Sequence, residues 1–265
     1  MKRRPRHRLV GVIHLPPLPG APRSRMTMAA ILEQTRSDAR ALAKAGFDLA
    51  MLENFGDAPF FAGAVPPVTV SAMTACALAA REAAPRLAIG INVLRNDVAS
   101  ALSIARVVGA SVVRVNVHTA ARLTDQGIVE GRAAETLRLR RALAADDVAL
   151  WADVDVKHAA PLARRALADE TKELVDRALA DAVLVTGEAT GAQVDLAKLR
   201  TVREAAPDAL VYVASGAVSG DLAALAEFAD GVIVGSALRK GGVAGGAVDE
   251  GRARTFAKAF RSAFP

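Results

Sequence analysis

Eight short apolar runs recur along the chain, and each is followed by a longer segment whose apolar residues have helical spacing. The runs are rich in Val, Ile and Leu, which is typical of strands that are buried on both faces of a parallel sheet. Several of the helical segments end at Gly or Pro just before the next run, where helices commonly stop. Strands are predicted at residues 8–15, 48–54, 87–94, 111–118, 148–157, 182–187, 209–215 and 231–236.

Eight strand–helix units in a chain of 265 residues predict an α/β fold, a single-domain (β/α)₈ TIM barrel. A doubly wound open sheet has the same alternation, but it usually carries a G-x-G-x-x-G turn after its first strand. Here that position reads HLPPLPG, which cannot form such a turn. No linker divides the chain, so we expect one barrel over residues 9–265, preceded by a basic arm at residues 1–8.

The formal charge of +6 is concentrated in the arm. Five of the positive charges come from Lys2, Arg3, Arg4, Arg6 and Arg8. The rest of the chain is nearly neutral and lacks the broad basic face that duplex binding requires, so we predict no nucleic-acid partner. The arm itself is expected to be a solvated terminus.

Cysteine usage and hydropathy indicate a cytoplasmic protein. Cys76 is the single cysteine, so no intrachain disulfide can form, and a reducing compartment is expected. The apolar run LVGVI near the N-terminus is too short for a secretory signal, and no uncharged run of about 18 apolar residues predicts a membrane span. A homo-oligomer is compatible with the sequence.

The stretch WADVDVKHAAPL alternates polar and apolar residues. Asp153, Asp155 and Lys157 have the two-residue spacing that places side chains on one face of a strand. In a barrel the other face packs on helices, so we expect all three to point inward near the carboxyl end and to form one paired network. The run SVVRVNVH repeats the pattern.

Polar residues also fall at the ends of other predicted strands, where barrel enzymes build their active sites. Placing such groups in a closed barrel without partners would cost several kcal/mol each. Each has a structural alternative: Asn92 could cap a helix, Glu53 could pair with Arg114, and His14 could be a core histidine. Their coincidence indicates a functional pocket. The predicted ring consists of His14, Glu53, Asn54, Asn92, Arg114, Asn116, His118, Asp153, Asp155, Lys157, Thr186 and Ser215.

Two turns that contain Gly and Ser, ASGAVSGD and IVGSALRKGG, follow the seventh and eighth predicted strands. In this fold these loops commonly present backbone N–H groups and a helix N-terminus to a phosphate. The alternative is that they only turn the chain. We predict a small phosphorylated ligand whose phosphate contacts Ser215, Gly216, Gly235 and Ser236, with Arg239 or Lys240 adding charge.

Six motifs resemble the BtpA/SgcQ family, in the same order from residue 10 to about residue 240. They are VGVIHLPPLPGAP, MLENFGDAPF, INVLRNDV, VRVNVHTAARLTDQGIVEG, ADVDVKHAAPL and VTGEATG. The resemblance implies a ribulose-phosphate-binding-type barrel. It associates one cyanobacterial branch with accumulation of photosystem I and another with a nucleosidase label, but with no established reaction, so no catalytic role is carried over. Ala214 departs from the pattern, because a Gly is expected before Ser215.

The charge state of Lys157 decides its chemistry. A lysine that forms a Schiff base needs a lowered pKa, whereas Asp155 on the same face favours the charged form. We therefore expect a charged Lys157 that stabilises a carboxylate or an oxyanion. The predicted catalytic residues are Glu53, Asp153 and Asp155 as general acid–base groups, with Lys157 as a stabiliser. The predicted substrate contacts are His14, Asn92, Arg114, Asn116, His118 and Thr186.

A divalent metal is the competing use of these carboxylates, with His14 or His118 completing the ligand set. No compact ligand motif is present and an ammonium opposes a cation, so no cofactor is predicted and a metal stays the alternative. The sequence favours an enzyme that acts on a small phosphorylated sugar or nucleotide-like compound by isomerisation, lyase cleavage or glycosidic-bond cleavage. The other interpretation, a membrane-peripheral assembly or stability factor with a non-catalytic ligand pocket, is favoured by the basic arm alone.

Overall fold

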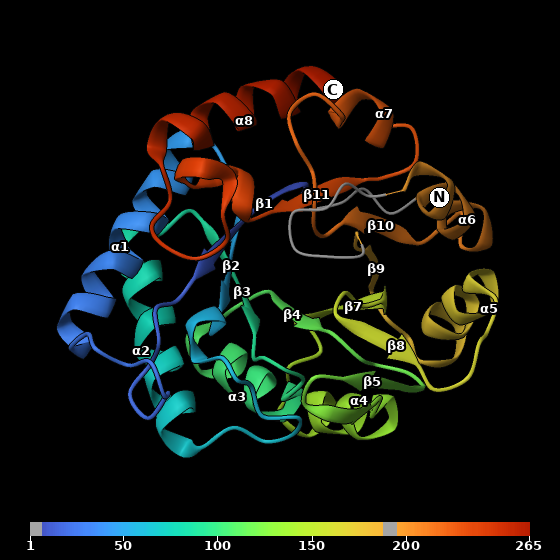
Figure 1. The fold of residues 1–265 in the computed structure, drawn as a ribbon, viewed down its shortest axis with the longest axis horizontal. Coiled ribbons are helices and arrows are strands. Elements are labelled where there is room, and N and C mark those ends of the chain that lie inside the picture. Colours follow the sequence, from blue (N-terminus) through green and yellow to red (C-terminus); the bar gives the residue numbers. More distant parts are fainter. Residues whose placement is uncertain (1–6, 188–194) are drawn as a thin grey trace.

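The computed structural model describes residues 7–187 and 195–265. Eight parallel strands close into a barrel that is surrounded by helices (Figure 1), which confirms the predicted (β/α)₈ TIM barrel. The strands follow one another around the barrel as β1 (Leu9–His14), β2 (Leu49–Glu53), β3 (Ala88–Asn92), β4 (Val112–Val115), β7 (Ala149–Asp155), β9 (Ala182–Val185), β10 (Leu210–Val213) and β11 (Gly231–Val234), which pairs with β1.

The connecting helices begin and end largely where local chemistry predicts. Asp97, Asp195 and Asp249 each accept a backbone N–H at the start of a helix, and Gly46 and Gly109 end helices with φ of 85° and 65°. The helices are α1 (Met28–Ala45), α2 (Pro67–Ala83), α3 (Val98–Val108), α4 (Ala133–Ala142), α5 (Leu167–Lys172), α6 (Leu196–Ala205), α7 (Leu222–Leu225) and α8 (Glu250–Ala263). Single-turn helices and one π-helical segment add η1 (Phe55–Asp57), η2 (Glu173–Arg177), η3 (Ser236–Leu238) and η4 (Lys240–Gly242).

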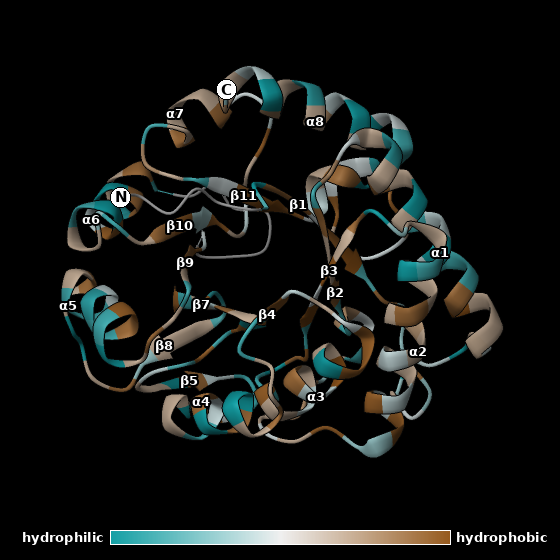
Figure 2. Ribbon diagram, turned by 180° about the vertical axis from the view of Figure 1, so that it is seen from behind, coloured by the Kyte–Doolittle hydropathy of each residue, from teal (hydrophilic) through white to brown (hydrophobic). Residues whose placement is uncertain are grey.

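The core has two parts, one inside the barrel and one between the barrel and the helices. Inside, Trp151 stacks on Tyr212 with ring centroids 4.3 Å apart, among inward Val and Leu side chains. Outside, strand residues such as Val113 and Val115 pack against helices. The helices show alternating hydrophobic and hydrophilic bands (Figure 2), as expected for helices with one face on the barrel. Filling the lower interior with apolar side chains leaves the carboxyl end for polar groups.

A small antiparallel sheet lies outside the barrel and was not expected from the sequence. Its strands are β5 (Ala121–Thr124), β6 (Gly127–Glu130) and β8 (Ala159–Pro161), in the order β6-β5-β8. The predicted strand at 111–118 is therefore too long: β4 ends at Val115, and Val117 packs with Val129 and Val156 instead. The segments after β4 and β7 thus build a sheet of their own.

Strand β7 carries a bulge near its carboxyl end. Asp153 is paired with Leu184 and Asp155 with the next residue of β9, Val185, so Val154 is an extra residue on β7. An inserted residue reverses the alternation of side chains beyond it. The bulge therefore separates Asp153 and Asp155, which a regular strand would place on one face.

The first described residues are attached to the barrel. The backbone N–H of Arg8 donates to Asp48 (2.8 Å), and the hydroxyl of Tyr212 donates to the carbonyl of His7 (2.7 Å). Residues 1–6, which hold most of the predicted basic arm, lie outside the described residues. Among the helices of the described ranges, none combines the length and apolar character that crossing a bilayer requires.

Candidate active site

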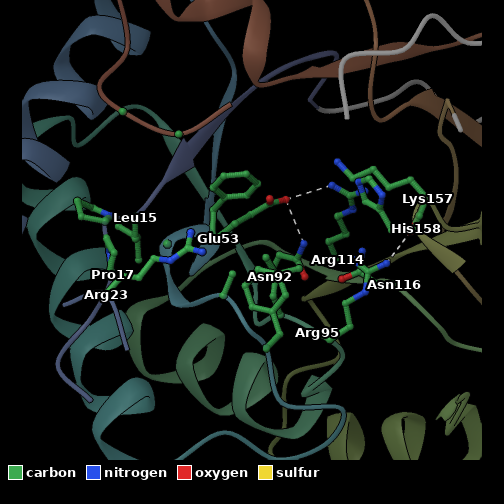
Figure 3. Close-up of a pocket in the computed structure, with 18 residues that line it drawn as sticks. Leu15, Pro17, Arg23, Glu53, Asn92, Arg95, Arg114, Asn116, Lys157 and His158 are labelled. Atoms are coloured by element: carbon green, nitrogen blue, oxygen red, sulfur yellow. Dashed lines mark hydrogen bonds and ion pairs between the residues drawn. The ribbon is translucent and has the colours of Figure 1, made fainter. Parts of the chain in front are cut away.

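A cavity of about 480 Å³ opens at the carboxyl ends of β2, β3, β4 and β7 (Figure 3). This volume lies within the range of about 300–1,000 Å³ that is typical of small-molecule sites. Apolar and aromatic residues, among them Leu15, Phe55, Phe60 and Leu94, form part of the wall. The buried or half-buried polar residues of the wall are Glu53, Asn92, Arg95, Arg114, Asn116 and Lys157.

Arg114 is the centre of a buried hydrogen-bond network beside the cavity. Its Nη1 donates to Glu53 Oε1 (3.1 Å), and its Nη2 donates to both carboxylate oxygens of Asp153 (3.2 Å each). Asn92 donates to the same Glu53 Oε1 (3.0 Å), and Asn116 donates to Asp153 Oδ2 (2.7 Å). Strands β2, β4 and β7 therefore meet at one guanidinium, and Asn92 of β3 joins them through Glu53. Asp153 is the partner of Arg114 behind the cavity wall.

The network keeps Glu53 ionised. Burial works to raise the pKa of Glu53, but the charge of Arg114, with smaller effects of His14 and Lys157, holds that pKa below its ordinary value. The pKa of Arg114 is opposed by burial and is raised by Asp153 and Glu53. Both hydrogen bonds to Glu53 end on Oε1, which leaves Oε2 without a partner among the described residues. A charged carboxylate with one free oxygen is suited to accept a proton.

Lys157 lies two residues beyond β7 and lines the cavity. Arg95 holds its backbone, since Nη2 of Arg95 donates to the carbonyl oxygen of Lys157 (2.6 Å). No ion pair or hydrogen bond joins the Lys157 ammonium to another described residue. Burial lowers the pKa of Lys157, and the charges of Arg114 and Arg95 lower it further, against Glu53 and Asp153. The amine is thus less readily charged than an exposed lysine.

Several buried polar atoms beside the cavity have no hydrogen-bond partner among the described residues. They are the side-chain oxygens Oδ1 of Asn92 and Asn116 and the Nε atoms of Arg95 and Arg114. Each such atom costs about 1–3 kcal/mol when it is buried without a partner. These two acceptors and two donors belong to residues that line one cavity, so the polar groups around it are not fully paired with one another.

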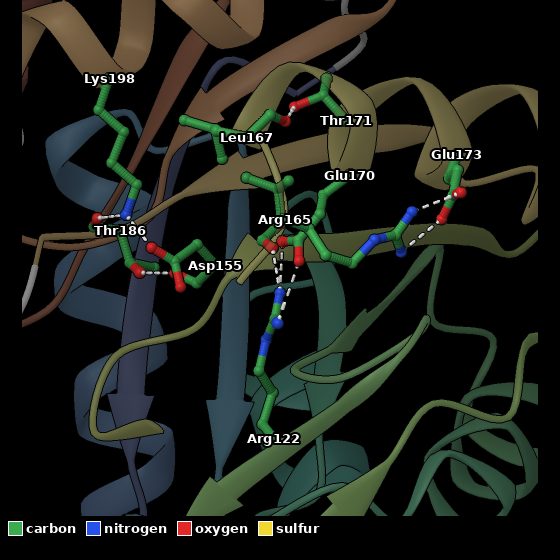
Figure 4. Close-up of polar contacts among 10 residues, drawn as sticks. Arg122, Asp155, Arg165, Leu167, Glu170, Thr171, Glu173, Thr186 and Lys198 are labelled. Atoms are coloured by element: carbon green, nitrogen blue, oxygen red, sulfur yellow. Dashed lines mark hydrogen bonds and ion pairs between the residues drawn. The ribbon is translucent and has the colours of Figure 1, made fainter. Parts of the chain in front are cut away.

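Asp155 is directed away from this network. Its Oδ2 forms an ion pair with Lys198 of α6 (2.7 Å), and its carbonyl oxygen accepts from the hydroxyl of Thr186 (2.8 Å) (Figure 4). The expected single face for Asp153, Asp155 and Lys157 is therefore wrong for Asp155, because the β7 bulge reverses the alternation. The premise that Asp155 keeps Lys157 charged fails with it. Thr186 joins this second cluster and does not line the cavity.

The two predicted histidines do not line the cavity either. His118 donates from Nε2 to the carbonyl oxygen of Ala178 (3.0 Å), beside the helices outside the barrel, because β4 has already ended. His14 packs on Phe55 with ring centroids 4.3 Å apart, and burial lowers its pKa to about 3. The neutral ring accepts the backbone N–H of Gly245 at Nδ1 (3.1 Å). His14 therefore supports residues that line the cavity.

Gly245 and Gly246 belong to a glycine-rich loop after β11 that forms part of the cavity wall. Both have positive φ (90° and 67°), which glycine adopts without strain. A second anchor of this loop is Asp38 of α1, whose Oδ1 accepts the N–H of Val248 (2.9 Å). The glycines of KGGVAGGAV indicate an unusual loop. Its place at the cavity could not be predicted, because the residues that hold it, His14 and Asp38, lie more than two hundred residues away along the chain.

Arg23 and Arg95 also line the cavity and were not predicted. Arg95 follows Asn92 closely after the end of β3, so its place in INVLRNDV was a usable signal. Arg23 lies in the loop between β1 and α1 and carried no pattern. Together they add two positive charges to a wall whose one lining carboxylate is Glu53.

The predicted phosphate contacts lie in two loops that approach each other. Gly216 and Ser236 line a second cavity of about 460 Å³, together with Arg252 and Thr255 of α8. Ser215 is buried, and Gly235 lies against the ring of His14, which a Cβ at that position would approach to 3.1 Å. The loops after β10 and β11 are thus adjacent. No ligand tests the phosphate contact, which stays a prediction.

A metal site is not formed by the predicted ligands. Over residues 7–187 and 195–265, no group of three or more His, Cys, Asp and Glu side chains has an arrangement that could hold a metal ion. Glu53 and Asp153 are both bonded to Arg114, and His14 and His118 point to other partners. The divalent metal remains an untested alternative.

Comparison with known proteins identifies relatives along nearly the whole chain. The sequence model of the BtpA family matches residues 5–262. The Photosystem I biogenesis protein BtpA of Synechocystis sp. is 44% identical over 95% of this chain and 87% of its own length. An uncharacterized protein of Methanocaldococcus jannaschii is 41% identical over 93% and 92% of the two chains, and a mitochondrial protein of Caenorhabditis elegans is 32% identical over 94% and 91%.

Solved structures share the fold at low sequence identity. KGPDC from Streptococcus mutans has a TM-score of 0.62 at 12% identity, covering 98% of this chain and 100% of its own. A structure described as native KDPGal has a TM-score of 0.59 at 14% identity, covering 100% and 97%. Phosphoribosyl anthranilate isomerase from Thermus thermophilus has a TM-score of 0.56 at 15% identity, covering 96% and 98%. At these identities the similarity concerns the barrel alone.

Proposed function

Because the chain belongs to the BtpA family, we propose that it performs the small-molecule chemistry for which its barrel cavity is equipped. The proposed activity is that of an enzyme that acts on a small anionic, phosphorylated sugar-like substrate by proton transfer. The observation that carries this proposal is the charged Glu53, held by Arg114 and Asn92, with one oxygen left free beside the cavity.

The charge of the wall supports an anionic substrate. Its cations are Arg23, Arg95, Arg114 and Lys157, and its one lining carboxylate is Glu53, with Asp153 behind Arg114. Arg114 is bonded to two carboxylates, whereas Arg95 has no carboxylate bonded to it among the described residues. Buried guanidinium groups bind carboxylates and phosphates strongly, so an anionic group of the substrate would complete the bonds of Arg95.

Glu53 is the proposed proton carrier. An ionised carboxylate is a weak base, so it removes a proton from carbon only where a neighbouring carbonyl or imine makes that proton acidic. Arg114 lines the cavity, and its positive charge would stabilise the negative charge that develops on the substrate oxygen. Isomerisation and lyase cleavage both use such a step. Solved barrels with related folds carry names of this kind, an isomerase among them, which fits an enzyme in general terms.

The loops after β10 and β11 are the proposed phosphate contacts. Gly216 and Ser236 line one cavity with Arg252, and small residues there allow close approach to backbone N–H groups. The glycine-rich loop connects this cavity with the first one, since Gly242 lines the second cavity and Gly245 lines the first. The proposed substrate therefore carries a phosphate that binds in the second cavity and a carbonyl group that reacts in the first.

Thermal-shift screening tests the proposal. Sugar phosphates, nucleotides and the matching dephosphorylated compounds are compared at equal concentration, because a ligand that binds the folded protein raises its melting temperature. We expect phosphorylated compounds to stabilise the protein more than their neutral counterparts and Glu53→Gln to abolish turnover of the best ligand. A screen in which phosphorylation never increases stabilisation contradicts the phosphate contact.

The second candidate is a role in assembly, favoured by the 44% identity to a photosystem I biogenesis protein. Similar proteins also occur in Methanocaldococcus jannaschii and Caenorhabditis elegans. This distribution favours a shared chemical reaction over a role in photosystem I assembly. Binding to anionic vesicles distinguishes the two. A protein that binds vesicles through its basic N-terminus and retains that function after Glu53→Gln would support the assembly role.

A further inference from the structure

We infer that Lys157 is an amine nucleophile that forms a covalent imine with the carbonyl carbon of the substrate. The substrate is then an oxo compound, such as a 2-oxo acid or a keto sugar. This inference deepens the proposed function and rests on it for the location of the substrate. It reverses the expectation of a permanently charged Lys157, and the reason is the position of Asp155.

The partner that would keep Lys157 charged is engaged elsewhere. Asp155 lies two residues before Lys157, but its carboxylate pairs with Lys198 (2.7 Å) on the far side of the β7 bulge. The two carboxylates nearest the cavity, Glu53 and Asp153, are both bonded to Arg114. Among the described residues no ion pair joins Lys157 to a carboxylate, although Glu53 and Asp153 act on it from a distance.

Neighbouring cations oppose a charge on Lys157. Arg95 and Arg114 both line the cavity with it, and Arg95 is bonded to the backbone of Lys157 itself. Burial is the largest effect that lowers the pKa of Lys157, followed by Arg114. A lysine that is desolvated and placed beside another cation is a nucleophile in its neutral form.

Arg95 also fixes where the amine can reach. Its side chain donates to the Lys157 carbonyl (2.6 Å), and its own backbone N–H donates to the carbonyl of Phe61 (3.2 Å). The chain therefore leaves β7 in a defined direction, with the Lys157 side chain at the cavity (Figure 3). Arg95 is a positioning residue for the amine as well as a binding group for an anion.

The step balances with the groups present. The neutral amine attacks the carbonyl carbon, a C–N bond forms, and the C=O electron pair moves to oxygen. A proton passes from nitrogen to that oxygen, and a second proton, taken from solvent, adds to the new hydroxyl group. Departure of that group as water leaves a protonated C=N bond, and the solvent proton is released again when water adds at the end. Glu53 then takes a proton from the adjacent carbon, and the electron pair of that C–H bond moves towards nitrogen to give an enamine. Return of the proton and addition of water release the product and the amine.

The test is trapping by sodium borohydride, whose hydride reduces an imine to a stable secondary amine. The full chain is incubated with pyruvate, dihydroxyacetone phosphate or ribulose 5-phosphate, reduced, and examined by intact mass and peptide mapping. We expect one adduct per chain, on the peptide that contains Lys157, with at least one of these compounds. Lys157→Met should lose the adduct, whereas Lys258→Met, which removes an exposed lysine of α8, should retain it.

Arg95→Met separates positioning from folding. If it melts near the wild-type temperature, we expect trapping at Lys157 to be reduced and to require a higher pH. Adducts distributed over all lysines as in the denatured chain, or no adduct with any of the three compounds, would overturn the imine. If no adduct is trapped but phosphorylated compounds still raise the melting temperature, the imine is ruled out and the proposed enzyme function is retained. Trapping without any preference for phosphate removes only the phosphate contact.

Discussion

Charged side chains are buried in two regions of the molecule, one outside the barrel and one at the cavity, and their hydrogen bonds differ. Outside the barrel, Arg122 donates to both oxygens of Glu170 (3.2 and 2.6 Å) and to the carbonyl of Val154 (3.1 Å), and neither side chain has a buried polar atom without a partner (Figure 4). At the cavity, Arg114 bonds Glu53 (Figure 3) and also Asp153, but its Nε has no partner among the described residues.

The difference shows what distinguishes a site from a structural ion pair. Burial is equal in both regions, since Arg114 and Arg122 are 4% and 5% exposed. A buried pair is weak support for function, because many such pairs are structural. Of these two regions, only the cavity combines buried polar atoms that lack a hydrogen-bond partner with an open pocket and the amine of Lys157. The predictions below alter each region in turn.

The largest effect is expected when Arg114 is removed. Arg114→Met leaves Glu53 and Asp153 buried without their cation, and breaking such a network costs about 3–5 kcal/mol. Denaturant unfolding should show this loss, and thermal-shift stabilisation by the best ligand should vanish. If the free energy of unfolding falls by less than about 1 kcal/mol, the network around Arg114 does not stabilise the carboxyl end of the barrel.

For the structural pair of Arg122 and Glu170, removing one partner should lower stability more than removing both. Arg122→Met should cost about 3 kcal/mol, because Glu170 stays buried without a counter-charge. The double variant Arg122→Met/Glu170→Leu should recover most of that stability, since two apolar side chains replace both charges. Ligand binding should be retained in the double variant. Loss of binding there would make Arg122 part of the site.

The sequence brought Glu53, Asn92 and Arg114 to one end of the barrel, although the network it predicted, of Asp153, Asp155 and Lys157, is not formed. It gave no signal for the pair of Arg122 and Glu170. Glu53, Asn92 and Arg114 end or occupy regular strands, so two-residue alternation and the barrel geometry were enough to bring them together. Arg122 and Glu170 lie 48 residues apart and meet only because of an additional sheet whose short strands have no clear pattern. Local periodicity carries no information about such a contact.

Asp155 and His118 show a second limit. Both were placed by extending strand alternation, and both lie where the strand is irregular or has ended. A bulge of one residue reverses the side chains of the strand residues that follow it, here Asp155, and nothing in WADVDVKHAAPL marks Val154 as the extra residue. Arg95 was missed for the opposite reason, because it lies in a loop where alternation makes no prediction.

Asp38 is an intermediate case, a buried carboxylate with one bonded and one unbonded oxygen outside both regions. Burial raises its pKa from 3.8 to about 6, against the Val248 N–H and Arg239. Between these values the folded chain holds the proton more tightly than the unfolded chain, so the contribution of Asp38 to stability is greatest below about pH 4 and is lost as the pH rises through about 6.

Asp38→Asn should remove this decline. From pH 4 to pH 7 the wild type should lose about 1–3 kcal/mol more stability than the variant, measured by denaturant unfolding at each pH. Parallel curves for the two proteins would show that Asp38 titrates as it does in the unfolded chain. The variant keeps an oxygen for Val248, so the loop at the cavity wall should stay in place.

The smallest effect is expected at the half-exposed pair. The side chain of Asp155 is 42% exposed, and that of Lys198 is 18% exposed. Asp155→Asn or Lys198→Met should therefore change the free energy of unfolding by less than about 1 kcal/mol, because solvent screens the pair. Both variants should retain borohydride trapping at Lys157. A loss of trapping in Asp155→Asn would return Asp155 to the catalytic network.

The central claim is that the cavity keeps a reactive amine, and the pH dependence of Lys157 acylation tests it most directly. The protein is labelled briefly with acetic anhydride across a pH series, and modification of the peptide that contains Lys157 is compared between the native chain and the urea-denatured chain. Since burial and the two arginines lower the pKa of Lys157, the midpoint in the native chain should lie below that in the denatured chain. A native midpoint equal to or above the denatured one would show that the cavity holds Lys157 as a charged group and would contradict the account.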